Sequence, residues 1–481
     1  MPSETKNYDL VIIGGGPAGI TAAATATAHK KTVAMIDSHH ELGGAGFNFG
    51  TIPSKALRET ALAMSGLKAR DLSGIDVTLR RELAISEFIG REQNIRALMT
   101  STFRTGTGSE LTEVFHGNAT FVDPHTVEVV PLPGKEGSGK ETLLLRGETI
   151  LIATGSSPIR PEIFPFGAGE IYDSNTILKL QHLPKRMAAI GAGVIGSEYG
   201  CTFAALGTTV HVIDVRDKLL PFLDGEISRT LTAAMESSGV TFHWNESVQK
   251  CEVLPSGEVT LLLGSGTPLT VDVVLVATGR KSNTGTLNLI MAGVKTGELG
   301  VVLVDNQFRT NVPHIFAAGD VIGFPALAST SMEQARQAVR CALRLAVSPL
   351  SPLLPNGIYT IPEASMVGET EESLKKQHVD YVVGRARYKD NARGRLIGDK
   401  EGLLKLLVRR ETMQLVGVHV VGEQATELIH IGLMAMRFGS SILVFNETCF
   451  NIPTLGTLYK AAAQDALQQL AESEPGLSSF D

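Results

Sequence analysis

Cysteine is scarce in this chain, which has four among its 481 residues. They stand far apart, without the spacing typical of zinc sites or of Cys-x-x-Cys redox motifs, at Cys201, Cys251, Cys341 and Cys449. This scatter argues against a metal centre. It favours free thiols in a reducing compartment, and we therefore expect a cytoplasmic protein.

Positive charge and long apolar runs are also in short supply. Lys and Arg number 43 against 50 Asp and Glu, which gives a formal net charge of -7. A general nucleic-acid surface needs a basic face, so this balance argues against a nucleic-acid partner. No apolar run reaches the length of a membrane span, and the first one, Leu10 to Ile13, is too short for a signal peptide. We therefore expect no nucleic-acid partner and no membrane segment.

Glycine, by contrast, is plentiful. The 50 glycines include several in ordered turns, outside any low-complexity run. A length of 481 residues predicts two or three domains. Hydrophobic residues at 43 % and charged residues at 19 % are typical of a soluble globular protein.

The first glycine-rich turn carries a nucleotide-binding signal. Gly14, Gly16 and Gly19 form a Gly-x-Gly-x-x-Gly pattern between an apolar run and an alanine-rich predicted helix, and a second predicted strand ends on Asp37. In such units the first glycine makes the turn, the second admits a pyrophosphate and the third lets the helix pack closely. The acid accepts a hydrogen bond from a ribose hydroxyl. These features together predict a dinucleotide-binding βαβ unit.

A second copy of this unit follows, with its glycines at Gly191, Gly193 and Gly196 and its acid at Asp214. In both copies the acid follows the first glycine by the same interval, 37 − 14 = 214 − 191 = 23. Two nucleotide sites in one chain imply electron transfer between them. Asp214 favours NAD, whereas Arg216 is either a receptor for the 2′-phosphate of NADP or an ordinary surface charge.

Residues 43–55 carry the strongest resemblance to a known family. They read Gly-Gly-Ala-Gly-Phe-Asn-Phe-Gly-Thr-Ile-Pro-Ser-Lys. This segment resembles the active-site segment of the flavoprotein disulfide reductases, Gly-Gly-x-Cys-x-x-x-x-Cys-x-Pro-Ser-Lys, whose two cysteines form a redox-active disulfide. Here Gly46 and Thr51 stand at the cysteine positions. No disulfide can form there, so the flavin is expected to be the last redox centre.

The resemblance covers nearly the whole chain and implies an α/β protein with two Rossmann-like domains and an α+β dimerisation domain. Ala-Thr-Gly at 153–155 and 277–279 resembles the family's crossovers between domains, and the segment ending on Asp320 resembles its second flavin motif. We expect an FAD-binding domain at 1–150 and 280–350, an NAD(P)-binding domain at 151–279 and a dimerisation domain at 351–481. Residues 60–115 look helical, and 134–140 are interpreted as a hairpin loop.

The resemblance also implies site residues. For FAD they are Gly14, Gly16, Gly19, Asp37, Gly44, Lys55, Gly117, Thr154, Gly155, Asp320 and Ala328. For NAD(P) they are Gly191, Gly193, Gly196, Glu198, Asp214, Arg216 and Gly279. Lys55 and Glu198 are the expected catalytic pair beside the flavin and the nicotinamide. The plain alternatives are a solvated lysine and a surface glutamate.

A second loss lies near the C-terminus. The family's acid–base pair for thiols is His-x-x-x-x-Glu, and the matching positions here are Ile452 and Thr457. The base is therefore missing as well as the disulfide, which argues against a disulfide substrate. His430 lies on an apolar predicted helix and is interpreted as a packed interface residue, not as a replacement base.

Within the family, the chain resembles the soluble pyridine nucleotide transhydrogenases in the segments Phe49 to Arg58, Gly357 to Glu363 and Phe450 to Thr454. It departs from that branch at Gly46 and at Thr457. The resemblance implies ping-pong hydride transfer from NADPH to NAD⁺ through FAD, in a homodimer. Two alternatives stay open: an NAD(P)H dehydrogenase that reduces a quinone or another non-thiol acceptor, and an FAD- and NAD(H)-binding redox sensor with little turnover.

Overall fold

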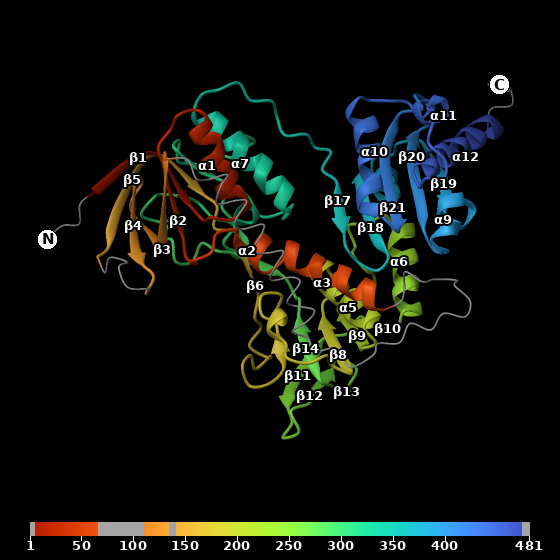
Figure 1. Ribbon diagram of the computed structural model, residues 1–481, viewed down its shortest axis with the longest axis horizontal. Coiled ribbons are helices and arrows are strands. Elements are labelled where there is room, and N and C mark those ends of the chain that lie inside the picture. The colour runs from red at the N-terminus through yellow and green to blue at the C-terminus, as the bar shows by residue number, and fades with distance from the viewer. Residues whose placement is uncertain (1–4, 66–109, 134–140, 474–481) are drawn as a thin grey trace.

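The computed structural model describes residues 5–65, 110–133 and 141–473. Figure 1 shows three lobes, one red to orange with teal helix α7, one yellow to green and one blue. Among the described residues, no helix has the length and apolar character needed to cross a membrane.

The first lobe is a six-stranded sheet with helices packed on it. Its elements are β1 (Thr5–Ile13), α1 (Pro17–Ala28), β2 (Val33–Asp37), β3 (Thr112–Asp123), β4 (Thr126–Pro131), β5 (Leu143–Ile152), β16 (Ile315–Ala317) and α7 (Ala328–Ala342). Strand β1 is parallel to both β2 and β5. The β1 residues Leu10 to Ile13 are buried, which fits a strand covered on both faces.

The second lobe repeats this plan with a parallel sheet in the order β10-β9-β8-β14-β7. Its elements are β7 (Ile171–Tyr172), β8 (Arg186–Ile190), α5 (Val194–Ala205), β9 (Thr209–Asp214), α6 (Gly225–Ser237), β10 (Val240–Trp244) and β14 (Val273–Val276). A three-stranded antiparallel sheet is attached, with β11 (Val248–Val253), β12 (Val259–Leu263) and β13 (Pro268–Val271). The predicted βαβ repeat is thus present in both lobes.

Two short strands connect the first two lobes. The outgoing strand β6 (Ser156–Pro158) pairs antiparallel with the returning strand β15 (Arg280–Ser282). They directly follow the two Ala-Thr-Gly segments. The side chain of Arg280 donates from Nε to the Ser156 hydroxyl at 2.8 Å and from Nη2 to the Ser156 carbonyl at 2.6 Å. The two crossings are thereby tied to each other.

The third lobe is a five-stranded antiparallel sheet in the order β17-β18-β21-β20-β19, with helices on it. Its strands are β17 (Asn356–Ile358), β18 (Glu363–Gly368), β19 (Tyr381–Arg387), β20 (Leu403–Arg409) and β21 (Leu415–Gly422). Its helices are α8 (Glu371–Lys376), α9 (Ala392–Leu396), α10 (Ala425–Arg437), α11 (Leu443–Glu447) and α12 (Thr457–Ser473). This matches the antiparallel sheet with helices that the sequence predicts after residue 351.

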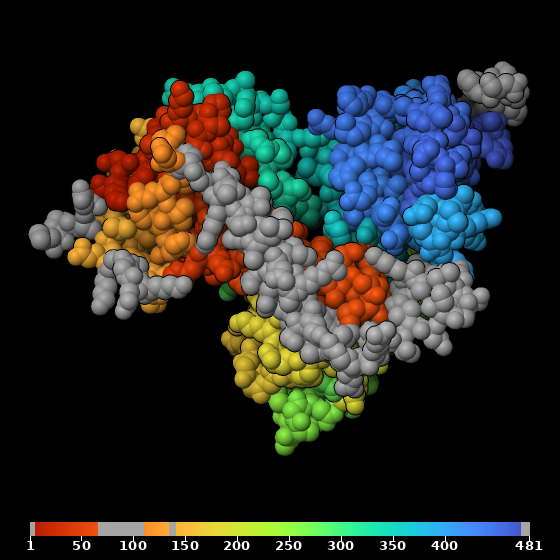
Figure 2. Space-filling view, in the orientation of Figure 1, coloured from red at the N-terminus to blue at the C-terminus, as the bar shows by residue number. Residues whose placement is uncertain are grey.

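Two helices place the Gly43–Lys55 segment between the lobes: α2 (Gly44–Asn48) and α3 (Thr51–Met64). Helix α3 packs on α5 of the second lobe and extends from the first lobe toward the other two (Figure 1). The space-filling view shows it at the surface between the yellow and blue parts (Figure 2). The site residues on α3 therefore meet side chains from elsewhere in the chain.

One predicted element is wrong in part. The helical interpretation of 60–115 fails at its end, because β3 begins at Thr112. Its burial alternates along the strand, and residues 112 to 116 pair in parallel with β2, so tertiary pairing outweighs the local pattern there. Helix α3 does cover residues 60–64. Residues 66–109 and the predicted loop at 134–140 lie outside the described residues.

Candidate functional site

The third glycine of each nucleotide turn has no room for a side chain. A Cβ atom on Gly19 would lie 1.8 Å from the carbonyl oxygen of Gly14, and one on Gly196 would lie 1.9 Å from that of Gly191. The two helices, α1 and α5, therefore pack equally closely on the turns that precede them. The close packing predicted for the third glycine is present in both units.

The second glycine of each turn has room for a methyl group. A Cβ on Gly16 would meet nothing nearer than the Gly44 Cα at 3.8 Å, and for Gly193 no described atom lies within 4 Å. Both residues are the N-caps of their helices. An open helix N-terminus accepts an anionic group, because its N–H groups lack intrahelical partners. Both turns thus fit a nucleotide pyrophosphate.

A buried polar atom supports the same fit at the first site. The hydroxyl of Thr154 is buried and has no hydrogen-bond partner among the described residues. The adjacent Gly155 has a φ of +66°, and a Cβ atom there would have no described atom within 4 Å. An unpaired buried hydroxyl beside open space is suited to a bound ligand that supplies the missing partner.

Asp37 and Asp214 each accept hydrogen bonds from the glycine turn of their own unit. Asp37 Oδ2 accepts from the backbone N–H of Gly15 at 2.7 Å, and Asp214 Oδ2 accepts from that of Ala192 at 2.6 Å. Each acid also accepts through Oδ1 from the N–H two residues later, both times at 2.8 Å. The acids therefore hold the glycine turn in place, a role that sequence reasoning missed.

Arg216 encloses Asp214. Its Nε donates to Oδ1 at 2.8 Å and its Nη2 to Oδ2 at 2.6 Å. Burial alone would raise the pKa of Asp214, but the hydrogen bonds from Arg216 outweigh it and hold the pKa below its usual range. In the first unit the same place is taken by His39, whose Nδ1 lies 3.3 Å from Asp37 Oδ1, and this hydrogen bond raises the pKa of His39.

The predicted catalytic pair is brought together. Lys55 on α3 donates from Nζ to Glu198 Oε2 on α5 at 2.7 Å. The side chain of Lys55 is 24 % exposed and that of Glu198 is 8 % exposed. This contact joins the first lobe to the second, and the pairing predicted from sequence is confirmed. The catalytic role of the two residues stays a prediction.

A third residue contacts both members of the pair. The backbone N–H of Tyr359 donates to Glu198 Oε1 at 2.9 Å, and the Lys55 ammonium lies 4.7 Å from the centre of the Tyr359 ring. Tyr359 comes from the third lobe, directly after β17. The sequence contained a signal for it, because Gly357 to Glu363 matches a transhydrogenase segment, but no role followed from that match.

The remaining predicted flavin residues come from several elements of the first lobe. Asp320 Oδ2 accepts from the Ser156 hydroxyl at 2.7 Å, and Ala328 begins α7. Gly44 has a φ of +54°, and a Cβ there would lie 2.9 Å from Gly16 Cα. Gly117 follows the β3 residue that pairs with Asp37. Of the nicotinamide set, Gly279 leads into β15 with a φ of +131°.

No sulfur is placed to act as a redox centre at this site, among the residues that the structure describes. The cysteine positions hold Gly46, where a Cβ would lie 3.0 Å from Pro17 Cγ, and Thr51, which is exposed. All four cysteines are free. Cys201 is near, since its Sγ accepts from the Ile361 N–H at 3.1 Å, but burial raises the pKa of its thiol to about 12. A thiol of that pKa is inert as a nucleophile at neutral pH.

The substitutes for the thiol base are equally unsuited to proton transfer. Ile452 is 73 % exposed and has no titratable group. The hydroxyl of Thr457 donates to the Thr454 carbonyl at 2.8 Å and accepts from Asn391 at 2.6 Å. His430 is exposed on α10 in the single chain, so its predicted interface role stays untested.

Two family profiles match this chain. That of the pyridine nucleotide-disulphide oxidoreductases matches residues 8–341, and that of their dimerisation domain matches residues 354–463. The chain therefore belongs to the pyridine nucleotide-disulphide oxidoreductase family. Membership makes it an oxidoreductase and implies a flavin and nicotinamide nucleotides as its redox groups.

Named relatives narrow the comparison. The chain is 40 % identical over 465 residues to the soluble pyridine nucleotide transhydrogenase of Mycobacterium tuberculosis, covering 97 % of this chain and 98 % of that protein. It is 40 % identical over 468 residues to the transhydrogenase of Azotobacter vinelandii, covering 96 % and 99 %.

Solved structures agree on the fold. The HOCl-induced flavoprotein disulfide reductase RclA from Escherichia coli matches with a TM-score of 0.84 at 26 % identity, covering 95 % of this chain and 99 % of that chain. LpdA from Mycobacterium tuberculosis matches with a TM-score of 0.85 at 26 % identity, covering 95 % and 98 %. The predicted α/β fold with two Rossmann-like units is thereby confirmed.

Proposed function

We propose that this protein is an FAD-dependent transhydrogenase that moves hydride between NADPH and NAD⁺. The observation that carries the proposal is the Lys55–Glu198 contact, 2.7 Å long, between the two nucleotide-binding lobes. No thiol pair or histidine base accompanies it at the positions that disulfide reductases use. The relatives named soluble pyridine nucleotide transhydrogenase, aligned over nearly the whole chain, support the same function.

The proposed FAD site is the open turn of the first lobe, at the N-terminus of α1. Gly16 leaves room there, Gly44 packs closely against Gly16, and Asp320 and Thr154 supply polar contacts. Bound flavin supplies the hydride acceptor and donor, which no amino-acid side chain can supply. The nicotinamide nucleotides would bind at the equivalent turn at the N-terminus of α5, beside Gly193.

The side chains of Lys55 and Glu198 provide a fixed charge beside the proposed flavin site. Lys55 keeps a positive charge between the lobes, and Glu198 fixes its ammonium by accepting a hydrogen bond. A fixed charge of this kind stabilises developing negative charge without reorganising during the reaction. Direct hydride transfer needs no side-chain acid or base, which agrees with Ile452 and Thr457 at the positions of the family's acid–base pair.

Arg216 accounts for the use of two nucleotides at one site. All accepting directions of Asp214 are filled, because two backbone N–H groups and two guanidinium nitrogens donate to its two oxygens. With NADP(H), Arg216 stays, neutralises Asp214 and offers its remaining N–H groups to the 2′-phosphate. With NAD(H), Arg216 turns away, and Asp214 accepts from the ribose hydroxyls. One turn therefore serves both nucleotides.

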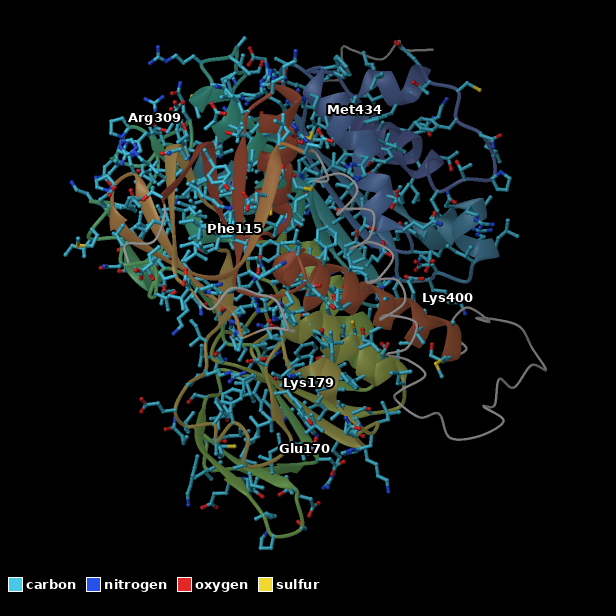
Figure 3. The ribbon with its side chains drawn as sticks, turned by 60° about the vertical axis from the view of Figure 1, so that its left-hand side comes forward. Phe115, Glu170, Lys179, Arg309, Lys400 and Met434 are labelled. Atoms are coloured by element: carbon cyan, nitrogen blue, oxygen red, sulfur yellow. The ribbon has the colours of Figure 1, made fainter. Side chains whose placement is uncertain are left out.

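A homodimer in the cytoplasm completes the proposal. The dimerisation-domain profile matches residues 354–463. Large apolar side chains are exposed on α10 and after it, among them Met434, labelled in Figure 3, Phe438 at 79 % and Ile452 at 73 %. Exposed large apolar side chains on a matched dimerisation domain are suited to a protein interface.

A steady-state assay tests the function. Purified protein receives NADPH with thio-NAD⁺ as acceptor, and parallel reactions contain a quinone in place of the nucleotide. Nucleotide reduction that exceeds quinone reduction supports a transhydrogenase. Faster turnover with the quinone would replace this proposal with an NAD(P)H dehydrogenase, and negligible turnover with both would favour a redox sensor.

A further inference from the structure

Residues 359–363, here called the strap, cross the two helices that carry the Lys55–Glu198 pair. The strap consists of the connection between β17 and β18 of the third lobe and the first residue of β18. Two anchors hold it one turn beyond the pair on each helix. On α3, Arg58 Nε donates to the Thr360 carbonyl at 3.0 Å. On α5, Cys201 Sγ accepts from the Ile361 N–H at 3.1 Å.

The strap is also held from behind. Glu363, at its end, lies 3.2 Å from Arg58 Nη2 and accepts from the Thr426 hydroxyl at 2.8 Å. Glu363 and Arg58 are both buried. A buried, hydrogen-bonded ion pair fixes the position of the groups around it, because separating the charges leaves one unpaired in a medium of low polarity. The strap is therefore a rigid part of the third lobe.

Tyr359 is the strap residue that reaches the pair. Its backbone N–H holds one oxygen of Glu198, while Lys55 holds the other. Its ring lies 4.7 Å from the Lys55 ammonium, within the range of a cation–π contact. Lys55 is thus held from two sides, by a carboxylate and by an aromatic face. Without the ring, only the Glu198 carboxylate and the Ser54 hydroxyl, at 3.3 Å, hold the ammonium, so the end of its four-carbon chain moves over a wider range.

We propose that Tyr359 is a positioning residue that holds the Lys55 ammonium against the flavin and thereby sets the midpoint potential of the bound flavin. The proposal rests on the proposed function only in assuming that flavin binds beside Lys55. A fixed positive charge favours the more negative, reduced flavin, so a displaced ammonium makes the potential more negative. The third lobe therefore tunes the redox chemistry of the other two.

The test measures the midpoint potential of the flavin in flavin-loaded full-length protein, without nicotinamide nucleotides. The variants are Tyr359→Leu, Tyr359→Phe, Lys55→Met and the double variant Lys55→Met/Tyr359→Leu. Tyr172→Leu, whose hydroxyl donates to Glu170 within the second lobe, is the control for removing an aromatic ring elsewhere. Only the part of the cation–π energy that differs between oxidised and reduced protein shifts the ratio of reduced to oxidised flavin, so Tyr359→Leu lowers this ratio by up to roughly 30-fold. At about 30 mV per tenfold for two electrons, the potential falls by up to about 45 mV.

The double variant distinguishes positioning from general damage. If Tyr359 acts through Lys55, Tyr359→Leu lowers the potential in the parent protein and adds nothing in the Lys55→Met background. Tyr359→Phe, which keeps the ring, and Tyr172→Leu keep the parent potential. An unchanged potential in Tyr359→Leu, or an equal fall in both backgrounds, overturns the proposal. No nicotinamide nucleotide enters this measurement. Its outcome therefore does not depend on whether the protein is active in the transhydrogenase assay.

Discussion

Asp37 and Asp214 occupy equivalent positions in two copies of one structural unit. Each ends the second strand of its unit and accepts from the backbone N–H that follows the first glycine, at 2.7 Å and 2.6 Å. Each also accepts from the N–H two residues further on, at 2.8 Å. The copies differ in the side chain that follows, His39 in one and Arg216 in the other. The sites therefore share a scaffold and differ in charge beside the acid.

The duplicated turns predict matched pairs of glycine variants. Gly19→Ala and Gly196→Ala place a Cβ within 2 Å of a carbonyl oxygen (1.8 and 1.9 Å), so both variants lower Tm or fail to fold. Gly16→Ala and Gly193→Ala have room and keep the parent Tm. Their added methyl groups meet the nucleotide instead, so Gly16→Ala loses flavin and Gly193→Ala raises KM for both nicotinamide nucleotides.

The measurements are Tm, the flavin content of the purified protein and steady-state KM values. Gly193→Ala must keep its flavin while Gly16→Ala loses it. Loss of flavin from Gly193→Ala, with an unchanged Gly16→Ala protein, would mean that the two turns have been assigned to the wrong nucleotides.

Arg216→Ala is predicted to separate the two nicotinamide nucleotides. Loss of a charge-assisted contact to the 2′-phosphate raises KM for NADPH by roughly 10- to 100-fold. KM for NADH stays the same or falls, because Asp214 becomes free to accept from the ribose. Arg186→Ala is the control: its guanidinium pairs with Glu258 and Asp272 at the opposite, amino-terminal end of β8. Equal losses for both nucleotides would contradict this account of Arg216.

Electron transfer without sulfur predicts a constant thiol count. We expect four free thiols in the denatured protein, both before and after anaerobic reduction with NADPH, because all four cysteines are free in the structure. A disulfide reductase would gain two thiols on reduction. Counting thiols with a chromogenic disulfide under denaturing conditions makes the comparison, and a gain on reduction would show a disulfide that this structure lacks.

A buried ionic cluster is predicted to hold the second and third lobes together. Lys405 on β20 is fully buried and pairs with Asp224 at 2.7 Å, with Glu226 at 3.0 Å and with Glu371. Lys405→Met leaves these carboxylates without their central cation and lowers the free energy of unfolding by about 3–5 kcal/mol. Lys375→Met, which removes an exposed lysine that also pairs with Glu371, causes a much smaller change. Chemical denaturation compares the two.

The same cluster predicts a dependence of stability on acid. Burial alone would raise the pKa of Asp224, but the neighbouring His419 and Lys405 lower it to about 2. An unfolded Asp titrates near pH 3.9, so this group contributes roughly 2–3 kcal/mol that is fully present above that pH. The contribution is lost as the pH falls from about 4 toward 2. Asp224→Asn should therefore show a shallower fall of Tm over that range than the parent protein, and parallel curves would contradict the assignment.

The sequence predicted the parts of the site that depend on local pattern. The glycine turns and the acids follow from spacing, because strand, turn and helix are adjacent in the chain. The Lys55–Glu198 pairing joins residues 143 positions apart, and the sequence supplied it only through the family resemblance. It did not predict Tyr359, since its contact with Lys55 joins residues about 300 positions apart (359 − 55 = 304). It also missed the two hydrogen bonds from the Arg216 guanidinium to Asp214, because the direction of a long side chain depends on its surroundings. Strand β3 was misjudged at its start because pairing with β2 decides its structure.

The measurement that tests the central claim most directly is stopped-flow reoxidation of the flavin. The flavin-loaded protein is reduced anaerobically with NADPH, freed of excess nucleotide and mixed with NAD⁺ while flavin absorbance is followed. The account predicts reoxidation by NAD⁺ at least as fast as steady-state turnover, with no thiol formed or lost. Reduced flavin that persists with NAD⁺ but is reoxidised rapidly by a quinone would contradict it.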